Sequence, residues 1–305
     1  MFRQALRRKI WLPVAGILAV ILLVVGCGGG DSTQSTTTPS TISGNITIKG
    51  SDTMVNLGAR WAEEFMKDYP KVSISVTGGG SGTGIAALIN KTTDICQASR
   101  KMTTDEIAQA EKNGVEPVEF VVALDGLSVV VNPSNSISEL TFQQLSDIYT
   151  GKLTNWKNVG GKDASIVALS RDTNSGTHVF FKEYVVQMAG LPTQNKKLEY
   201  GSKVLMMPSS KTGITEVAQN SNAIFYVGMG YVTDEVKVIK IKRTETDTAI
   251  VPSILGVRNG SYPVSRPLYL YTNGQPMDAI KAYVDWVMGT KGQQIVTKLD
   301  FVTLK

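Results

Sequence analysis

Short apolar runs alternate with longer amphipathic segments from about residue 45 to the C-terminus. The runs have the length and β-branched content of strands, and they predict strands at 46–48, 72–76, 120–124, 127–131, 166–169 and 223–227. The segments between them repeat apolar side chains at helical spacing, and they predict helices at 55–69, 85–90, 104–113, 141–149, 179–189 and 279–299. Strands and helices in alternation predict an α/β fold with mostly parallel sheets.

The N-terminus has a different pattern. Four cationic side chains at positions 3, 7, 8 and 9 precede an apolar run over residues 10–25, which Pro13 interrupts near its start. A stable membrane span needs about 20 apolar residues, so this run predicts a signal peptide over residues 1–26. The run ends in Val-Val-Gly-Cys at 24–27, which resembles a bacterial lipobox, and Cys27 is therefore the predicted site of lipidation. An uncleaved anchor with an incidental cysteine is the alternative.

Polar residues follow Cys27. Residues 28–41 offer no apolar side chain to bury, so they cannot offset the entropy lost on ordering. We expect residues 27–44 to form a lipidated flexible tether and the folded body to begin near Asn45. The body is then expected outside the cytoplasm, in the periplasm or at the cell surface, anchored to the cell membrane through Cys27.

Charge and cysteine content exclude some functions. The sequence has 31 Lys and Arg against 26 Asp and Glu, and loss of the four cations before the apolar run leaves 27 against 26. A nearly neutral body gives no electrostatic support for a nucleic-acid partner. Apart from Cys27 the sequence contains only Cys96, which we expect to be a small buried residue on a strand. No metal site or cofactor is expected, because Cys96 has neither a second thiol nor nearby histidines.

Three glycine- and hydroxyl-rich stretches carry the candidate chemistry. They lie at 50–53, 78–84 and 171–177, and each follows a predicted strand and precedes a predicted helix. The first turn of a helix has unpaired backbone N–H groups and the positive end of the helix dipole, so such an entry suits an anion. The third stretch begins with Arg171, whose planar fork of donors matches a tetrahedral oxyanion. The stretches together predict a pocket for a small oxyanion.

The motifs resemble those of the phosphate-binding lipoproteins that serve Pst-type phosphate ABC transporters. The resemblance runs from about residue 46 to the C-terminus and keeps the order and spacing of the motifs. It rests on Gly50-Ser51-Asp52-Thr53-Met54, the glycine-rich run 79–84, Asp94-Ile95 with Ala98-Ser99-Arg100, the segment 148–152 leading to Asn155-Trp156, and Arg171 with Ser175-Gly176-Thr177.

The resemblance implies a two-domain periplasmic-binding-protein fold of type II, with the ligand in a cleft between two lobes. Domain 1 would comprise residues 45–131 and 233–305, and domain 2 residues 132–232. Crossover strands near 127–131 and 226–232 would form the hinge, although the strand predicted at 236–243 could belong to either lobe. Closure of the hinge would bring both lobes onto the anion.

The resemblance also implies a set of ligand-binding residues. Hydroxyl and backbone donors from domain 1 would meet donors and an arginine from domain 2. The predicted set is Ser51, Asp52, Thr53, Ser81, Gly82, Thr83, Ser99, Arg100, Arg171, Ser175, Gly176 and Thr177.

One position departs from the family. Some phosphate binders have an aspartate where this sequence has Arg100, and that aspartate accepts the proton of hydrogenphosphate. Sulfate carries no such proton, so an acceptor carboxylate separates the two anions. Asp52 is our candidate replacement, with an N-cap role as its alternative and Asp125 or Asp172 as other acceptors. Arg100 would either add a second cation to the site or pair with Asp52.

These features predict a monomeric lipoprotein, not an enzyme, that captures inorganic phosphate and delivers it to the permease subunits of an ABC importer. Alternatives are a binder of sulfate, molybdate or tungstate, a surface sensor or adhesin, and a serine hydrolase or phosphatase using Ser81 or Ser175. The sequence gives a serine hydrolase or phosphatase no convincing base, because His178 is more simply a polar residue at a helix start. No Gly-x-Ser-x-Gly elbow is present either.

Overall fold

The computed structural model describes residues 42–304, so the predicted signal peptide, Cys27 and nearly all of the tether lie outside the described residues. The described residues belong to one compact unit, Ser40–Lys305. Within 42–304, no helix combines the length and the apolar character needed to cross a membrane.

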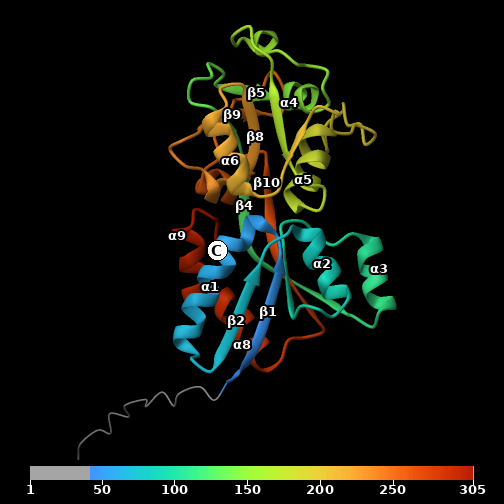
Figure 1. Ribbon diagram of the computed structural model, residues 1–305, viewed down its shortest axis with the longest axis vertical. Helices are drawn as coiled ribbons and strands as arrows, with labels where there is room; N and C mark the ends of the chain where they lie inside the picture. The colour runs from blue at the N-terminus through green and yellow to red at the C-terminus, as the bar shows by residue number, and fades with distance from the viewer. Residues whose placement is uncertain (1–41, 305) are drawn as a thin grey trace, which may run out of the picture. The chain divides into compact units, whose positions relative to one another are not determined.

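The described strands join in one ten-stranded sheet with β10 and β4 at its middle (Figure 1). The main order is β2-β1-β3-β10-β4-β8-β6-β7, while β9 pairs with β4 and β5. The sheet is mixed: β1 and β6 pair in parallel with their neighbours, whereas β4 and β10 are antiparallel to theirs. The prediction of mostly parallel sheets is therefore wrong for the middle strands. The strands are β1 (Gly44–Gly50), β2 (Val72–Thr77), β3 (Ile95–Ala98), β4 (Pro117–Val131), β5 (Glu139–Thr141), β6 (Val167–Arg171), β7 (Leu205–Met207), β8 (Ala223–Gly228), β9 (Lys237–Lys242) and β10 (Ser265–Asn273).

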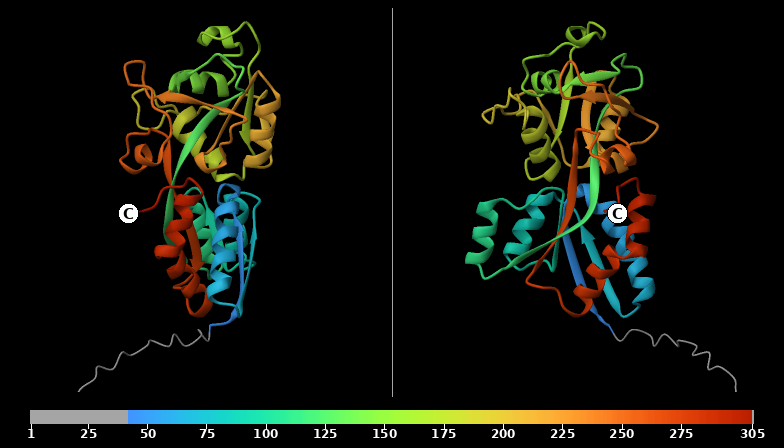
Figure 2. Two further views of the ribbon diagram at one scale, coloured as in Figure 1. Left: turned by 90° about the vertical axis from the view of Figure 1, so that its left-hand side faces the viewer. Right: turned by 180° about the vertical axis from the view of Figure 1, so that it is seen from behind.

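Helices cover both faces of the sheet in each of two lobes (Figures 1 and 2). In the first lobe, α1, α8 and α9 bury their apolar residues on one face, and α2 and α3 pack on the other. In the second lobe, α4 and α5 cover one face and α6 the other. The helices are α1 (Val55–Asp68), α2 (Ser81–Ile89), α3 (Thr104–Lys112), α4 (Phe142–Tyr149), α5 (Gly176–Phe181), α6 (Ser210–Gln219), α7 (Ile254–Arg258), α8 (Asp278–Met288) and α9 (Thr290–Lys298). Shorter turns are η1 (Asp52–Met54), η2 (Trp156–Val159), the π-helical η3 (Lys182–Val186) and η4 (Met229–Tyr231).

The two lobes share β4 and β10, which run side by side between them (Figure 2). Along β4, Ala123 still packs in the core of the first lobe, whereas Leu127 packs in the core of the second. Where the chain returns to the first lobe, Val264 packs in the core of the second lobe and Leu268 in the core of the first. The chain therefore crosses between the lobes within β4 and again at the start of β10.

The second crossover differs from the sequence-based expectation. Strand β9 pairs with β4 and β5, and its Ile239 and Ile241 are buried in the core of the second lobe. The segment that begins at residue 233 thus stays with the second lobe instead of returning to the first. We propose domain boundaries near residues 125 and 266 in place of those at 131 and 233.

Other elements also differ from their predictions. The two strands predicted at 120–124 and 127–131 are one strand, β4, that continues through Asp125 and Gly126. The helix predicted at 279–299 is two helices, which meet at Gly289. Strand β10 and helix α6 were not predicted at all.

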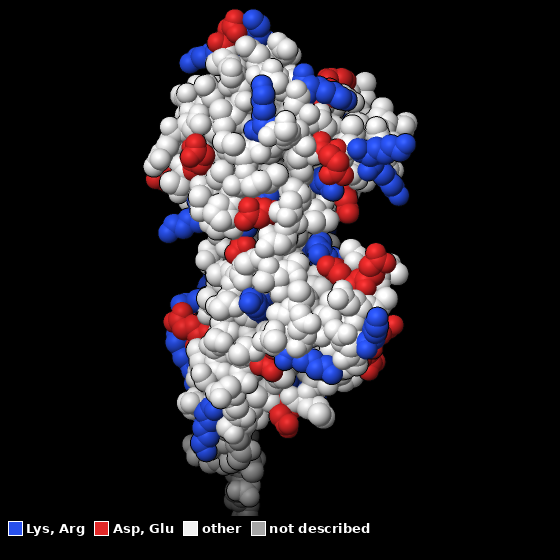
Figure 3. Space-filling view, turned by 45° about the vertical axis from the view of Figure 1, so that its right-hand side comes forward, with Lys and Arg blue, Asp and Glu red and all other residues white. Residues whose placement is uncertain are grey.

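Charged side chains are dispersed over the surface. The face in Figure 3 shows cationic and anionic residues of both lobes interspersed, without a large area of one sign. This distribution agrees with the nearly balanced charge of the body.

Candidate anion-binding site

The three predicted motifs lie where strands pass into helices. Strand β1 leads into η1 and α1, β2 leads into α2, and β6 leads into α5. Gly80 precedes α2 with φ +92, a conformation that favours glycine, and Ser175 caps α5 through its side chain. The helix starts thus present backbone N–H groups in the manner that the sequence predicted.

Hydroxyl groups from the two lobes meet at these helix starts. The Oγ1 atoms of Thr53 in the first lobe and Thr177 in the second lie 2.8 Å apart. Behind Thr53, Ser51 Oγ donates to Ser99 Oγ over 2.9 Å, and Ser81 Oγ lies 3.3 Å from the same Ser99 oxygen. All five side chains are buried, so the structure brings together hydroxyls that are far apart in the sequence.

Gly176 allows the two lobes to approach closely. A Cβ atom at this position would lie 2.4 Å from Ser81 Oγ and 2.7 Å from Ser99 Oγ. These distances are too short for any side chain, so the contact between the start of α5 and the first-lobe hydroxyls requires glycine. The structure thus places Gly176, at the start of α5, against the buried hydroxyls of the first lobe, next to the cap residue Ser175.

Arg171 is buried at the end of β6 and bridges the lobes. Its Nη2 donates to Asp52 Oδ2 over 2.7 Å and to Pro208 O, its Nε donates to Met207 O, and its Nη1 donates to Ser210 Oγ. These bonds use four of the five N–H groups of the guanidinium. Arg171 is thus fixed in place, with one Nη1 hydrogen outside these bonds.

Asp52 does not cap its own helix. Its Oδ1 accepts the Gly79 N–H over 3.1 Å, and its Oδ2 accepts Arg171. The first turn of η1 has no side-chain cap. The alternative of an N-cap aspartate is therefore wrong for this residue, which instead joins the first two motifs to the third.

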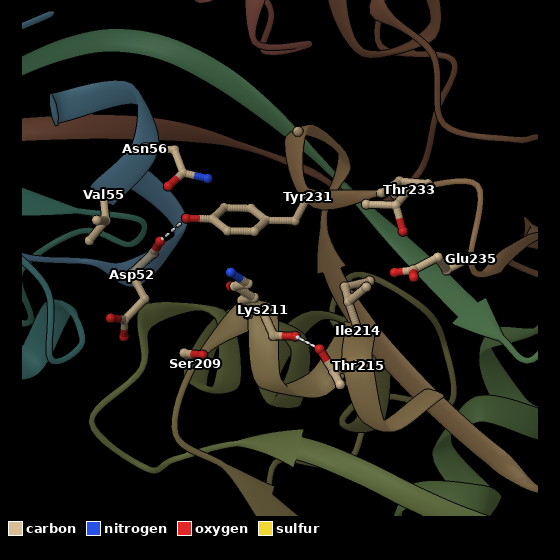
Figure 4. A pocket seen from close by; sticks show the side chains of 13 residues that line it. Asp52, Val55, Asn56, Ser209, Lys211, Ile214, Thr215, Tyr231, Thr233 and Glu235 are labelled. Atoms are coloured by element: carbon tan, nitrogen blue, oxygen red, sulfur yellow. Dashed lines mark hydrogen bonds between the residues drawn. The ribbon is translucent and has the colours of Figure 1, made fainter. Parts of the chain in front are cut away.

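A pocket of about 470 Å³ opens beside Asp52, between the starts of α1 and α6 and the segment 230–235. In Figure 4 the Tyr231 side chain points at the backbone of Asp52, where its hydroxyl donates to the carbonyl oxygen over 2.6 Å. Burial raises the pKa of Tyr231 to about 12, so it remains a donor at neutral pH. The Asp52 side chain is 16% exposed and lines this pocket, which gives its carboxylate access to solvent.

Gly82 and Thr83 contact the second lobe through Asn174. The Gly82 N–H donates to Asn174 O over 2.9 Å, and Asn174 Nδ2 donates to Gly79 O and to Thr83 Oγ1. The structure therefore places these two predicted residues at a contact between the lobes, while the buried hydroxyls lie deeper.

Arg100 is bound differently from either predicted role. Its guanidinium forms a fork with the Glu106 carboxylate, with N···O distances of 2.7 and 2.8 Å. The predicted pairing with Asp52 is wrong, because Asp52 binds Arg171 while Glu106, one turn into α3, takes Arg100. Glu106 also closes the capping box of α3 with Thr103, which holds the carboxylate in place.

A second buried arginine reaches the site and was not predicted. Arg266 on β10 lies opposite Asp125 on β4, and its Nη2 is 3.0 Å from Asp125 Oδ2. The same Nη2 donates to Thr177 Oγ1 over 2.9 Å and to Thr53 Oγ1 over 3.3 Å. A positively charged residue in an apolar run of strand length was the signal that could have identified it.

His178 supports the backbone of the site. Its Nδ1 donates to Arg171 O over 2.8 Å and lies 3.0 Å from Ser170 Oγ. Burial lowers the pKa of His178, which favours the neutral ring. The sequence has no other histidine, and this ring nitrogen does not activate Ser81 or Ser175. The arrangement gives no support to a serine nucleophile with a histidine base.

Cys96 is buried on β3, as predicted, and burial raises the pKa of its thiol. Within residues 42–304, no group of three or more His, Cys, Asp or Glu side chains could hold a metal ion.

Comparisons with known proteins agree with one another. Residues 35–291 match the family model described as PBP superfamily domain. The chain is 33% identical over 282 residues to "Phosphate-binding protein PstS" of Pseudomonas aeruginosa, an alignment that covers 87% of this chain and 84% of that protein. It is 28% identical to the Bacillus subtilis protein of the same name, with 93% and 90% covered.

Solved structures show the same likeness. A putative phosphate ABC transporter substrate-binding protein from Clostridium perfringens, solved with bound phosphate, matches with a TM-score of 0.75 at 32% identity. The match covers 86% of this chain and 100% of that one. An ABC-type phosphate transport receptor from Vibrio cholerae matches with a TM-score of 0.67 at 27% identity, with 85% and 99% covered.

Proposed function

Because the chain belongs to the PBP superfamily, and within it to the family of the phosphate-binding proteins named PstS, we propose that it captures inorganic phosphate and delivers it to an ABC importer. The family and the two-lobed α/β fold predicted from the motifs are thereby confirmed. The relatives are named as binding and transport proteins, and we propose that this chain likewise binds its ligand without catalysis.

One observation carries the proposal: buried hydroxyls of both lobes converge at three helix starts. Thr53 and Thr177 touch across the lobes, and Ser81 lies against Gly176. A hydroxyl pair can share only one proton between its oxygens, so a ligand rich in acceptor oxygens can use the remaining donors. Helix starts add N–H groups and a favourable dipole for a negative charge. A tetrahedral oxyanion matches this combination.

We assign the binding roles as follows. Thr53, Ser81 and the start of α2 bind from the first lobe, and Arg171 with the start of α5 binds from the second. Gly82 and Thr83 hold the closed state through Asn174. The proposed ligand-binding set is Ser51, Asp52, Thr53, Ser81, Ser99, Arg171, Ser175, Gly176 and Thr177. Arg100 is omitted because Glu106 binds its guanidinium.

Asp52 is the proposed acceptor of the phosphate proton. It lies beside Arg171, has solvent access and is not used as a helix cap. A partly buried carboxylate and an oxyanion that carries no proton repel each other, so sulfate is disfavoured. Other oxyanions such as sulfate, molybdate or tungstate are the alternative ligands.

Calorimetry of the purified full chain tests this function. We expect phosphate to bind, and sulfate to bind at least about tenfold to hundredfold more weakly, because the protonless anion leaves an acceptor unpaired. Molybdate titrated in parallel covers the remaining tetrahedral anions. Tighter binding of sulfate or molybdate than of phosphate would assign the protein to another anion.

We further propose that the protein is an extracytoplasmic monomer, anchored to the cell membrane through a lipid on Cys27, which lies outside the described residues. Cys27→Ala should abolish lipidation and lipoprotein-type cleavage, whereas Cys96→Ala, a matched cysteine change in the body, should leave both intact. Metabolic labelling with a fatty acid and N-terminal analysis would show this. Unchanged processing of Cys27→Ala would refute the lipid anchor.

A further inference from the structure

Arg266 and Asp125 form an ion pair inside the molecule, on the two strands that both lobes share. They are direct partners in the antiparallel register of β10 and β4. Their side chains are 2% and 0% exposed, and Nη2 and Nε of the arginine lie 3.0 and 3.3 Å from Asp125 Oδ2. The Arg266 guanidinium also lies over the Phe180 ring of α5, 5.5 Å from its centroid. A desolvated charge in this position must be held by its partners.

The same guanidinium contacts hydroxyls of both lobes. Its Nη2 donates to Thr177 Oγ1 at 2.9 Å and to Thr53 Oγ1 at 3.3 Å. Thr53 lies in η1, just before α1 of the first lobe, and Thr177 lies in the first turn of α5 in the second lobe. Arg266 therefore lies where the two halves of the candidate site join.

The chemistry of a guanidinium fixes the direction of these hydrogen bonds. Arginine only donates, so each threonine oxygen accepts from it and must point its own O–H elsewhere. One of the two hydroxyl protons lies between the threonines, which are 2.8 Å apart, and the other is directed away from Arg266. The pair therefore offers a ligand oxygen one free O–H group, and a ligand that replaces the bond between the two threonines gains the second.

Arg266 also has unused capacity. Its Nη1 is enclosed and has no hydrogen-bond partner among residues 42–304. A buried donor without a hydrogen-bond partner destabilises the folded protein. If Arg266 served only to pair with Asp125, its unpartnered Nη1 would bring no compensating benefit. The contacts with Thr53 and Thr177 indicate a role in the site.

We propose that Arg266 is a positioning residue for the ligand: it holds Thr53 and Thr177 as donors toward unprotonated oxygens of the anion, with Asp125 as its counter-ion. The proposal rests on the proposed function, because it takes the anion to be phosphate. It also gives the anion an orientation. The unprotonated oxygens face Thr53 and Thr177, and the P–OH group turns toward Asp52.

A double-mutant cycle on the full chain tests this role. Asp125→Leu combined with Arg266→Met removes both charges and leaves no lone buried charge. Thr177→Val removes one oriented hydroxyl with little change in shape. Calorimetry measures the affinity for inorganic phosphate in four proteins: the wild type, the variant without the ion pair, Thr177→Val, and the variant that carries all three substitutions. The thermal midpoint of each protein is also recorded without phosphate.

We expect removal of the ion pair to weaken phosphate binding about tenfold or more in the wild-type background. In the Thr177→Val background, the factor by which the same removal weakens binding should be smaller by at least about threefold. An arginine that only holds the fold would lower affinity by the same factor in both backgrounds, and that result would overturn the proposal.

Arg266→Lys is the second variant, in case the double change does not fold. Lysine keeps the charge beside Asp125 but cannot reproduce the rigid fork that serves both threonines. We expect a folded protein with about tenfold weaker phosphate binding. Arg243→Lys is the matched control, since Arg243 is partly buried against Phe142 and Tyr184 away from the site, and it should bind phosphate as the wild type does.

The outcomes separate the two proposals. A wild type that binds no phosphate would overturn the proposed function, and the role of Arg266 would fall with it. A wild type that binds phosphate, with Arg266→Lys or the double change binding within about twofold of it, would overturn the role of Arg266 alone.

Discussion

Among residues 42–304, two arginines are buried, and each is paired with an aspartate at a distinct place around the candidate site. Arg171 and Asp52 lie at its mouth, 2.7 Å apart, beside a pocket that exposes part of Asp52. Arg266 and Asp125 lie at its floor, 3.0 Å apart and fully enclosed. The first pair joins the two lobes, whereas the second joins β4 and β10, the strands that the lobes share.

The difference in placement gives the pairs different tasks. The contact between Asp52 and Arg171 links residues of the two lobes, so its energy favours the arrangement in which the lobes are in contact. The contact between Asp125 and Arg266 follows from the register of β4 and β10, close to where both strands cross between the lobes. The mouth pair is therefore suited to ligand binding and selectivity, and the floor pair to stability and to the orientation of the hydroxyls above it.

The largest expected effect concerns the floor pair. Arg266→Met alone leaves Asp125 enclosed without its counter-ion, so the free energy of unfolding should fall by about 3–5 kcal/mol. Asp125→Leu with Arg266→Met should lose much less, since no lone charge remains. Urea denaturation without phosphate measures both. Equal losses in the single and double variants would contradict the assignment of the penalty to an unpaired charge.

The mouth pair should affect binding more than stability. Arg171→Ala removes a forked donor and the link between the lobes, so phosphate affinity should fall by about 30- to 1000-fold, or 2–4 kcal/mol. Unfolding should change less than for Arg266→Met, because Asp52 can be hydrated from the pocket. Arg171→Lys should recover part of the affinity. Calorimetry that finds Arg171→Ala within about threefold of the wild type would place Arg171 outside the binding site.

The two pairs were not equally predictable from the sequence. Arg171 and Asp52 stand in glycine- and hydroxyl-rich stretches between a strand and a helix, a local pattern with a clear physical meaning. Asp125 and Arg266 stand in apolar strand segments and meet only through the pairing of β4 with β10, 141 positions apart. Sequence reasoning had no local signal for that pairing.

Two local features of the sequence in this region are not typical of the strands that contain them. Asp125-Gly126 resembles a turn between two strands, yet β4 continues through it, because Asp125 pairs with Arg266 and Gly126 fits against Val257. Pro267 lies within β10, and a proline can occupy a strand at a position where its missing N–H is not required. The pairing of Arg100 with Glu106 could not be predicted from the Ala98-Ser99-Arg100 motif, because it depends on the capping box that holds Glu106 at the start of α3.

Selectivity should depend on the mouth pair alone. Asp52→Asn removes the proposed proton acceptor, so the preference for phosphate over sulfate should fall by about tenfold or more, or 1.4 kcal/mol. Asp52→Ala should change it in the same direction without offering a new donor. Titrations with both anions at one pH and ionic strength give the ratio. An unchanged ratio would transfer the discrimination to Asp125 or Asp172.

The smallest effect concerns pH and again separates the two pairs. His178 donates to the carbonyl oxygen of Arg171, so it supports the backbone beneath the mouth pair. Burial lowers its pKa below 6.5 and outweighs the hydrogen bond to Arg171 O, which raises the pKa; nearby Lys182 lowers it further, whereas Glu199 and Asp172 raise it. The unfolded chain then binds a proton before the folded protein does, and the stability that the neutral ring contributes is present above about pH 6.5 and lost as the pH falls below it.

The loss from this one group cannot exceed about 1.4 kcal/mol per pH unit, and it should be absent in His178→Asn, whose amide can still donate to Arg171 O without titrating. Denaturation midpoints between pH 7.5 and about 5 for the wild type and His178→Asn measure the difference, and phosphate affinity over the same range shows whether the mouth pair feels it. The ring of His178 is hydrogen-bonded to Ser170 and to the backbone of Arg171, so this test concerns the mouth pair. Parallel pH profiles for wild type and His178→Asn would show that the titration of His178 does not contribute to the pH dependence of stability.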